Sequence, residues 1–313
     1  MEQAKGLVAN SLGIPSFCRT VRQICCIRRT LVPDQSRMGM FEQRVRFFLL
    51  GACALPFLSV HAQNPQQLIQ QVVDAELASI QNDHSKWVYF QETQKPKVQF
   101  KQWVATTQQG NIERILEKDG QRLSEPEQRD RIQKFLHDTK AQKKQISTTD
   151  HDFRQISDLL KLLPVAFVWT QTDATATTTS LHFDPAPQFR PPTLEARVFS
   201  GMTGDLVLDN QQHRVCSITG HLLRDVKFGG GLLGRLKQGS SFSLKQEQVG
   251  PSLWQLTSIQ VQFQGNALFF KSVSLQEDDE YSKFQLGPSG ITLEQAAVAV
   301  MKQPDFGPEH VSR

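Results

Sequence analysis

The stretch Ile259-Gln260-Val261-Gln262-Phe263-Gln264 alternates strictly between apolar and amide side chains. Because successive side chains of a β-strand point to opposite faces of its sheet, this pattern places the apolar groups on one face and the glutamines on the other. A strand with one buried and one solvated face is typical of an antiparallel sheet that is covered on one side. The stretch therefore predicts such a sheet and identifies the face that lies against the core.

Further strand patterns extend this sheet in both directions along the chain. Runs rich in β-branched and aromatic residues predict strands at 87–93, 97–107, 111–118, 166–172, 178–183, 195–200, 204–208, 214–223, 241–248, 254–264 and 267–275. A phase change between Phe100 and Trp103 predicts a β-bulge. Polar connections at 209–212 and 265–266, and the dipeptide Asp119-Gly120, predict hairpin turns.

Helical spacing of apolar residues predicts helices at 64–82, 124–144, 150–163 and 292–302. The second opens on Ser124-Glu125-Pro126-Glu127, a capping-box sequence, and the third stops at Pro164. Strands in one sheet with a few covering helices predict an α+β fold with a curved antiparallel sheet. We expect a single domain over residues 63–303, followed by a polar tail at 304–313.

Residues 40–62 have the features of a bacterial export signal. Arg44 and Arg46 precede an apolar run at 47–60, and Val60-His61-Ala62 offers small residues for cleavage. The run is shorter than the roughly 20 residues that span a bilayer. We therefore expect a periplasmic or secreted protein cleaved near Ala62, the alternatives being an uncleaved anchor and lipidation at Cys53. Residues 1–39 are interpreted as an over-extended gene start or a disordered extension.

Removing this leader changes the composition of the chain. The whole sequence has a formal net charge of +4, but the first 62 residues hold eight Lys and Arg against three Asp and Glu. The rest has 27 basic and 28 acidic residues, a net charge of −1, which gives no argument for nucleic-acid binding. Only Cys216 lies beyond the leader, so no disulfide is expected within the domain, and this thiol is expected to be buried.

Three polar or glycine-rich segments resemble sites without meeting the requirements of one. Asp150-His151-Asp152 is interpreted as a helix cap rather than a metal site. The glycine-rich segment 228–234 lacks the Lys-Ser/Thr end of a phosphate loop and is interpreted as a connection between strands. Glu277-Asp278-Asp279-Glu280 is interpreted as a solvated turn. We therefore expect no enzymatic activity, metal or cofactor.

Large side chains on the predicted strands are candidates to line an apolar cavity. The candidate lining residues are Tyr89, Trp103, Trp169, Phe263 and Phe269. Their alternative role is to fill an ordinary core.

The order of segments also resembles a known group. Trp87-Val88-Tyr89-Phe90-Gln91-Glu92 is followed by the segment 112–124, which includes Glu117-Lys118-Asp119-Gly120-Gln121-Arg122-Leu123-Ser124, and later by Gly204-Asp205-Leu206-Val207-Leu208-Asp209. This organisation, over residues 65–285, resembles uncharacterised bacterial envelope proteins related to the outer-membrane lipoprotein carrier LolA and receptor LolB. The chain departs from that group at Val207, where its members often have Trp.

This resemblance implies an incomplete antiparallel β-barrel, or half-barrel, with helices as a lid, whose apolar interior receives acyl chains of lipoproteins or similar lipids. We expect a monomeric, non-catalytic periplasmic carrier or chaperone of a hydrophobic ligand. The alternative is an envelope module that binds another protein and has no small-molecule ligand. No functional residue of the group can be matched to a position of this chain.

Overall fold

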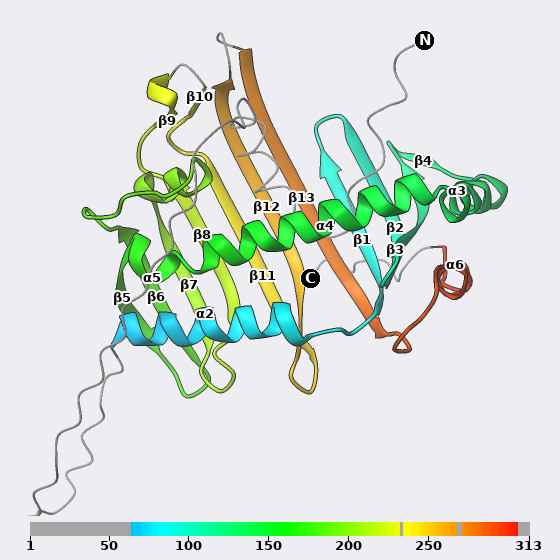
Figure 1. Ribbon diagram of the computed structural model, residues 1–313, viewed down its shortest axis with the longest axis horizontal. Coiled ribbons are helices and arrows are strands. Elements are labelled where there is room, and N and C mark those ends of the chain that lie inside the picture. The colour runs from blue at the N-terminus through cyan, green and yellow to red at the C-terminus, as the bar shows by residue number, and fades with distance from the viewer. Residues whose placement is uncertain (1–63, 232–233, 268–270, 306–313) are drawn as a thin grey trace, which may run out of the picture.

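The computed structural model of the protein describes residues 64–231, 234–267 and 271–305 (Figure 1). The predicted leader, with Cys53 and Ala62, and most of the predicted tail lie outside these residues. Within them, 13 strands form one open antiparallel sheet in the order β4-β3-β2-β1-β13-β12-β11-β8-β7-β6-β5, and β9 and β10 extend it beside β12. No helix in this part of the chain combines the length and apolar character needed to cross a bilayer.

The strands occupy most of the regions that alternation predicts. They are β1 (Trp87–Lys95), β2 (Val98–Thr107), β3 (Gly110–Lys118), β4 (Gln121–Arg122), β5 (Phe167–Ala174), β6 (Thr178–Pro185), β7 (Met202–Asp209), β8 (Val215–Leu222), β9 (Val226–Phe228), β10 (Gly234–Leu236), β11 (Ser241–Gly250), β12 (Leu253–Ala267) and β13 (Lys271–Leu286). The helices are α2 (Pro65–Asn82), α3 (Glu125–His137), α4 (Thr139–Leu160), α5 (Leu163–Ala166) and α6 (Leu293–Met301), with short 3₁₀ turns η1 (Glu195–Gly201) and η2 (Gly229–Gly231).

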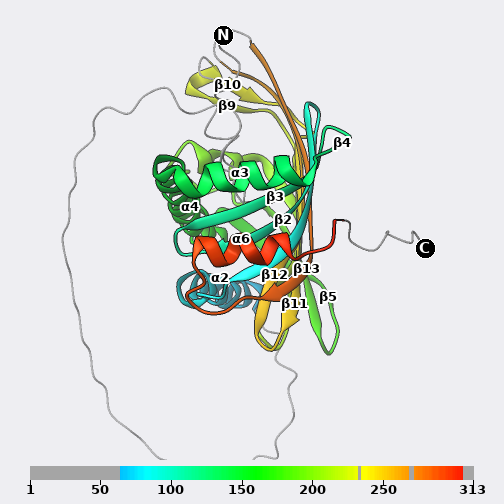
Figure 2. The ribbon, with the colours of Figure 1, turned by 90° about the vertical axis from the view of Figure 1, so that its right-hand side faces the viewer.

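The sheet curls around α2 and α4, which cross one of its faces (Figure 2). This concave face carries the larger core cluster, in which α2 contributes Leu68, Ile69, Val72 and Val73. A second cluster lies on the opposite face of β1, β2 and β3, where α6 packs. Strand alternation separates the two clusters, since Tyr89 belongs to the first and its neighbour Phe90 to the second. The predicted curved antiparallel sheet with covering helices is thus confirmed.

The division between α3 and α4 differs from the prediction. A continuous helix was expected up to residue 144, with the next beginning at 150, whereas the chain breaks at Asp138. The Asp138 side chain accepts a hydrogen bond from the Ala141 backbone N–H at 2.9 Å and caps α4. The break therefore comes six residues early, and Asp150-His151-Asp152 lies in the middle of α4 instead of at a cap.

Two other local predictions were wrong. Residues 195–200 form η1, whose start is held by the Ala196 N–H donating to Thr193 Oγ1 at 3.1 Å, so the alternation there is not that of a strand. The predicted turn at Gly265-Asn266 is part of β12. A Cβ at Gly265 would lie 2.3 Å from the Arg235 carbonyl oxygen, so this glycine permits β10 to approach β12 rather than a turn.

The remaining local signals agree with the structure. The register of β2 against β3 shifts between Lys101 and Gln102, which is the expected bulge. Asp119 and Gly120 have φ values of 52° and 78° and turn the chain from β3 into β4. The glycine-rich segment connects β9 to β10.

Candidate functional site

The structure brings together three of the five aromatic residues expected to line a cavity. Tyr89, Trp169 and Phe263 all belong to the core cluster on the concave face. Phe269 lies outside the described residues. Trp103 lies on the opposite face, where its ring is 5.2 Å from that of Phe90 and its indole N–H donates to the Pro304 carbonyl at 2.8 Å. Trp103 therefore supports the packing of α6 and does not share a cavity with the other three.

The concave face has an apolar part that crosses five strands. In register from β6 to β12, the residues of one row are Leu181, Leu206, Ile218, Leu244 and Ile259. The two ends of the row are buried, whereas Ile218 and Leu244 in its middle are half-buried. This row forms an apolar floor beneath the helices.

The same row becomes acidic on β13, where sequence reasoning expected a solvated turn. Residues 277–280 lie inside β13, and Ile259 of the apolar floor is paired with Asp279, which is paired in turn with Thr93 of β1. Glu277 and Asp279 are only 2% and 3% exposed, while Glu280 on the other face is exposed. The alternation of burial within the acidic run is that of a strand, so the interpretation as a solvated turn was wrong.

The two buried carboxylates have different partners. Glu277 forms an ion pair with Lys95, and Asp279 accepts a hydrogen bond from the Thr93 hydroxyl. Burial, reinforced by the neighbouring Glu277 carboxylate, raises the pKa of Asp279 to about 7. Asp279 can therefore exchange a proton near neutral pH.

Two tyrosines adjoin this acidic pair. The rings of Tyr89 and Tyr281 are 6.0 Å apart, and both side chains are buried. Burial raises the pKa of both phenols, and the negative charge of Asp279 raises it further. Both phenols therefore remain protonated at physiological pH and keep an O–H that can donate a hydrogen bond. We refer to Asp279, Glu277, Thr93, Lys95 and Tyr281 as the acidic cluster.

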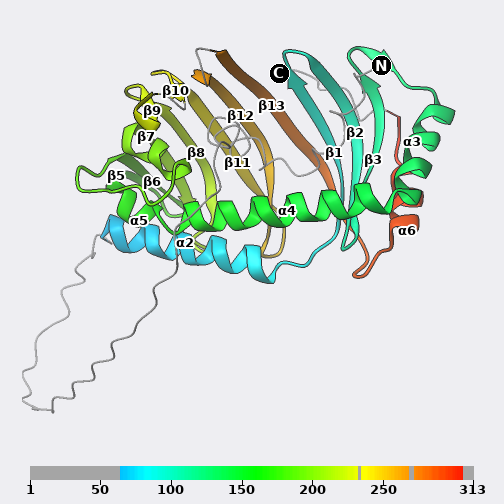
Figure 3. The same ribbon diagram turned by 45° about the horizontal axis from the view of Figure 1, so that its top comes forward.

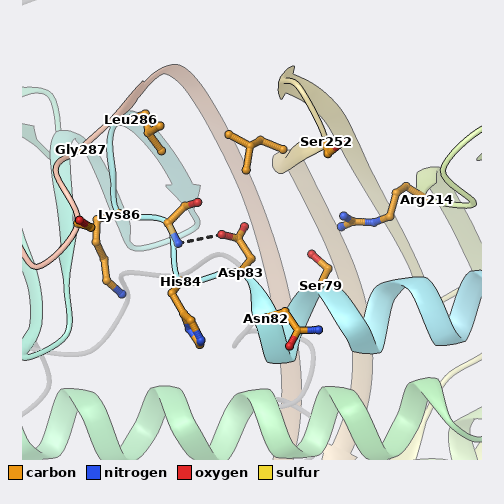
Figure 4. Close-up of a pocket in the computed structure, with 12 residues that line it drawn as sticks. Ser79, Asn82, Asp83, His84, Lys86, Arg214, Ser252, Leu286 and Gly287 are labelled. Carbon is orange, nitrogen blue, oxygen red and sulfur yellow. Dashed lines mark hydrogen bonds between the residues drawn. The ribbon is translucent and has the colours of Figure 1, made fainter.

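A polar cleft of about 650 Å³ opens at the C-terminal end of α2 (Figure 4). Ser79, Asn82 and Asp83 at the end of α2 form one wall, with His84 and Lys86 from the following loop. The rest of the lining comes from Arg214, Ser252, Leu253, Leu286, Gly287 and Ser289, and from Ser85, whose backbone N–H donates to Asp83. Its charged side chains are Asp83, Lys86 and Arg214, and most of the remaining lining is polar and uncharged.

Arg214, on the inner wall of this cleft, is held by a buried ion pair with α2. Its Nε and Nη2 donate to the two carboxylate oxygens of Glu76 at 3.0 and 3.1 Å, and the Val215 backbone N–H donates to the same carboxylate at 2.9 Å. The guanidinium also lies 5.8 Å from the centre of the Trp254 ring. This arrangement ties α2 to β8 and is structural.

Across the residues that the structure describes, no group of His, Cys, Asp and Glu is arranged to hold a metal ion. Cys216 is half-buried, and burial raises the pKa of its thiol, which makes it a poor nucleophile. The acidic cluster and the apolar floor are therefore the features best suited to bind a ligand. The chain matches no family model, and no curated protein matches its sequence significantly.

Proposed function

We propose that the protein is a non-catalytic carrier or chaperone of the bacterial envelope that binds an apolar chain, such as a lipid acyl chain, between α4 and the concave face of the sheet. The resemblance to LolA-like carriers and the export-signal pattern of residues 40–62 support a location in the bacterial envelope. The apolar floor supports the proposal that the ligand is an apolar chain.

The single observation that carries this proposal is the loose packing of α4. Gln145 and Asp152 are the buried residues of this helix, and its apolar side chains are half-buried. Phe153 and Ile156 belong to neither core cluster among the described residues, although Leu159 and Leu160 do pack against the larger one. An amphipathic helix that covered a filled core would bury its whole apolar stripe.

The half-buried side chains of α4 and of the apolar floor are complementary. A long hydrocarbon chain placed along the floor would cover the half-buried Ile218 and Leu244, and the half-buried apolar side chains of α4 would be available to pack on it. Each methylene removed from water would contribute about 0.8 kcal/mol, which favours long unbranched chains over short ones.

The test is direct binding to the purified full-length domain. We expect native mass spectrometry to detect co-purified lipid or stoichiometric binding of hexadecanol. Leu244→Lys places a charge on the floor and is expected to weaken hexadecanol binding at least about tenfold, because a charge in an apolar site is strongly disfavoured. Ser243→Lys is the matched control, since it adds the same charge to the opposite face of the same strand.

Circular dichroism of each variant separates loss of binding from loss of folding, and Leu244→Ala provides a milder second change. A protein that carries no lipid and binds no sixteen-carbon amphiphile would refute the carrier function. In that case the alternative, a module that binds another envelope protein, would be favoured.

A further inference from the structure

Buried polar atoms without hydrogen-bond partners lie on β13, the strand of the acidic cluster, and on α4, which crosses the concave face. In the described part of the chain, the Tyr281 hydroxyl on β13 and His151 Nε2 and Gln155 Oε1 on α4 are buried and have no partner. Nearly all buried polar groups in folded proteins are hydrogen-bonded, because an unpaired one has lost its water without gaining a partner. Such unpaired groups therefore indicate places that a polar ligand group or water can occupy.

These atoms belong to facing elements. His151 and Gln155 are one helical turn apart and flank Asp152, which is buried on the inner side of α4. Figures 1 and 3 show that the middle of α4 crosses β12 and β13, the strands that carry the end of the apolar floor and the acidic cluster. The row Ile259–Asp279–Thr93 marks the boundary between the apolar and the acidic part.

The charges of this region are not balanced. Lys95 forms an ion pair with Glu277, and Asp279 accepts a hydrogen bond from the Thr93 hydroxyl, so one cation faces two buried carboxyl groups. Tyr281 is 5% exposed, and its hydroxyl lies close enough to Asp279 for the carboxylate to affect its titration. Because the pKa of Asp279 is about 7, a bound cation would stabilise its ionised form, whereas a bound anion would add to the repulsion between the two carboxylates.

We propose that the acidic cluster, with His151 and Gln155 of α4, binds the head group of an amphiphile that carries a protonated amine, while its hydrocarbon chain lies along the apolar floor. This inference rests on the proposed carrier function and adds the class of head group. The ammonium donates to Asp279 and Gln155 Oε1, and Tyr281 donates to a head-group oxygen where the ligand has one. Fatty acids, whose carboxylate would face Asp279 and Glu277, are disfavoured.

Three sixteen-carbon probes test this selectivity on the full-length domain below their critical micelle concentrations: hexadecylamine, hexadecanol and palmitate. We expect hexadecylamine to bind at least about tenfold more tightly than hexadecanol, because hydrogen bonds between charged partners are about twice as strong as neutral ones. Palmitate is expected to bind most weakly. Tryptophan fluorescence or titration calorimetry measures the three dissociation constants.

Asp279→Asn is expected to weaken hexadecylamine binding about 10- to 100-fold and to change hexadecanol binding by less than about twofold. Asp278→Asn is the matched control, because it makes the same change on the opposite face of the same strand. Hexadecanol binding by the Asp279→Asn variant also reports whether that variant is folded.

Two outcomes would overturn the inference in different ways. If hexadecylamine and hexadecanol bind equally, or if Asp279→Asn leaves the preference unchanged, the head-group assignment is wrong and the carrier function stands. If none of the three probes binds, both the head-group assignment and the carrier function are wrong.

Discussion

Breaking the buried ion pair between Glu76 and Arg214 should destabilise the protein severely. Glu76 is 6% exposed and Arg214 is 9% exposed, and the carboxylate accepts three hydrogen bonds. Glu76→Ala leaves a buried guanidinium and the Val215 N–H without their acceptor, which costs about 3–5 kcal/mol in comparable buried pairs. Since a domain is stable by only about 5–15 kcal/mol, this is a large part of the total.

The double variant distinguishes a buried pair from two independent packing losses. Replacing both residues by Met removes the unpaired charge, and we expect it to be more stable than Glu76→Ala by at least about 2 kcal/mol. Equilibrium urea unfolding followed by circular dichroism measures all variants. Arg129→Ala removes the exposed pair with Glu125, whose side chains are each 60% exposed, and should cost less than about 1 kcal/mol.

The reasoning would be refuted if Glu76→Ala were no more destabilising than Arg129→Ala. It would also be refuted if the single substitutions Glu76→Met and Arg214→Met had additive costs in the double variant. Either result would mean that the pair is solvated and does not hold α2 against β8.

Two further predictions concern the sheet. The pKa of Asp279 is raised from 3.8 to about 7 in the folded protein. Between about pH 4 and 7 the folded state therefore keeps a proton that the unfolded state has lost. The contribution of Asp279 to the free energy of unfolding falls as the pH rises from about 4 to about 7. The stability of Asp279→Asn relative to the wild type should therefore rise over that range and become constant above it. Urea unfolding at several pH values measures this difference, and a difference that does not change with pH would exclude the effect. Gly204→Ala should destabilise the protein by about 3 kcal/mol or more, because its Cβ would lie 1.9 Å from the Thr219 carbonyl oxygen and 2.7 Å from Phe183 Cζ. Thermal unfolding would measure this loss, and a melting temperature within about 2 °C of the wild type would contradict it.

The regular parts of the fold were predictable because they depend on short-range patterns. The alternation of residues 259–264 identified a strand and its buried face, and Ser124 with Glu127 identified the start of α3. Both signals work within a few residues, since side-chain direction in a strand and capping in a helix are local properties. The class of fold followed from their repetition along the chain.

Local patterns failed where a distant segment decides the conformation. Gly265 has the composition of a turn, but β10 packs against its backbone. Four consecutive acidic residues are typical of solvent, yet Lys95 and Thr93 from β1 pair with two of them and keep them inside the sheet. The sequence around Gly265 does not identify β10 as its partner, and the sequence around residues 277–280 does not identify Lys95 or Thr93.

The sequence alone determined the class of fold, the polar and apolar faces of its strands, and the candidate export signal. It also indicated aromatic residues for an apolar interior, but it could not separate Trp103 from Tyr89, because the strand register that puts them on opposite faces is set by pairing with β1. Only the tertiary structure placed the buried Asp279 at the end of an apolar row, on a strand that α4 crosses in Figure 3. The physical reason is that a binding site joins residues far apart in the chain, and their juxtaposition depends on the pairing of whole strands.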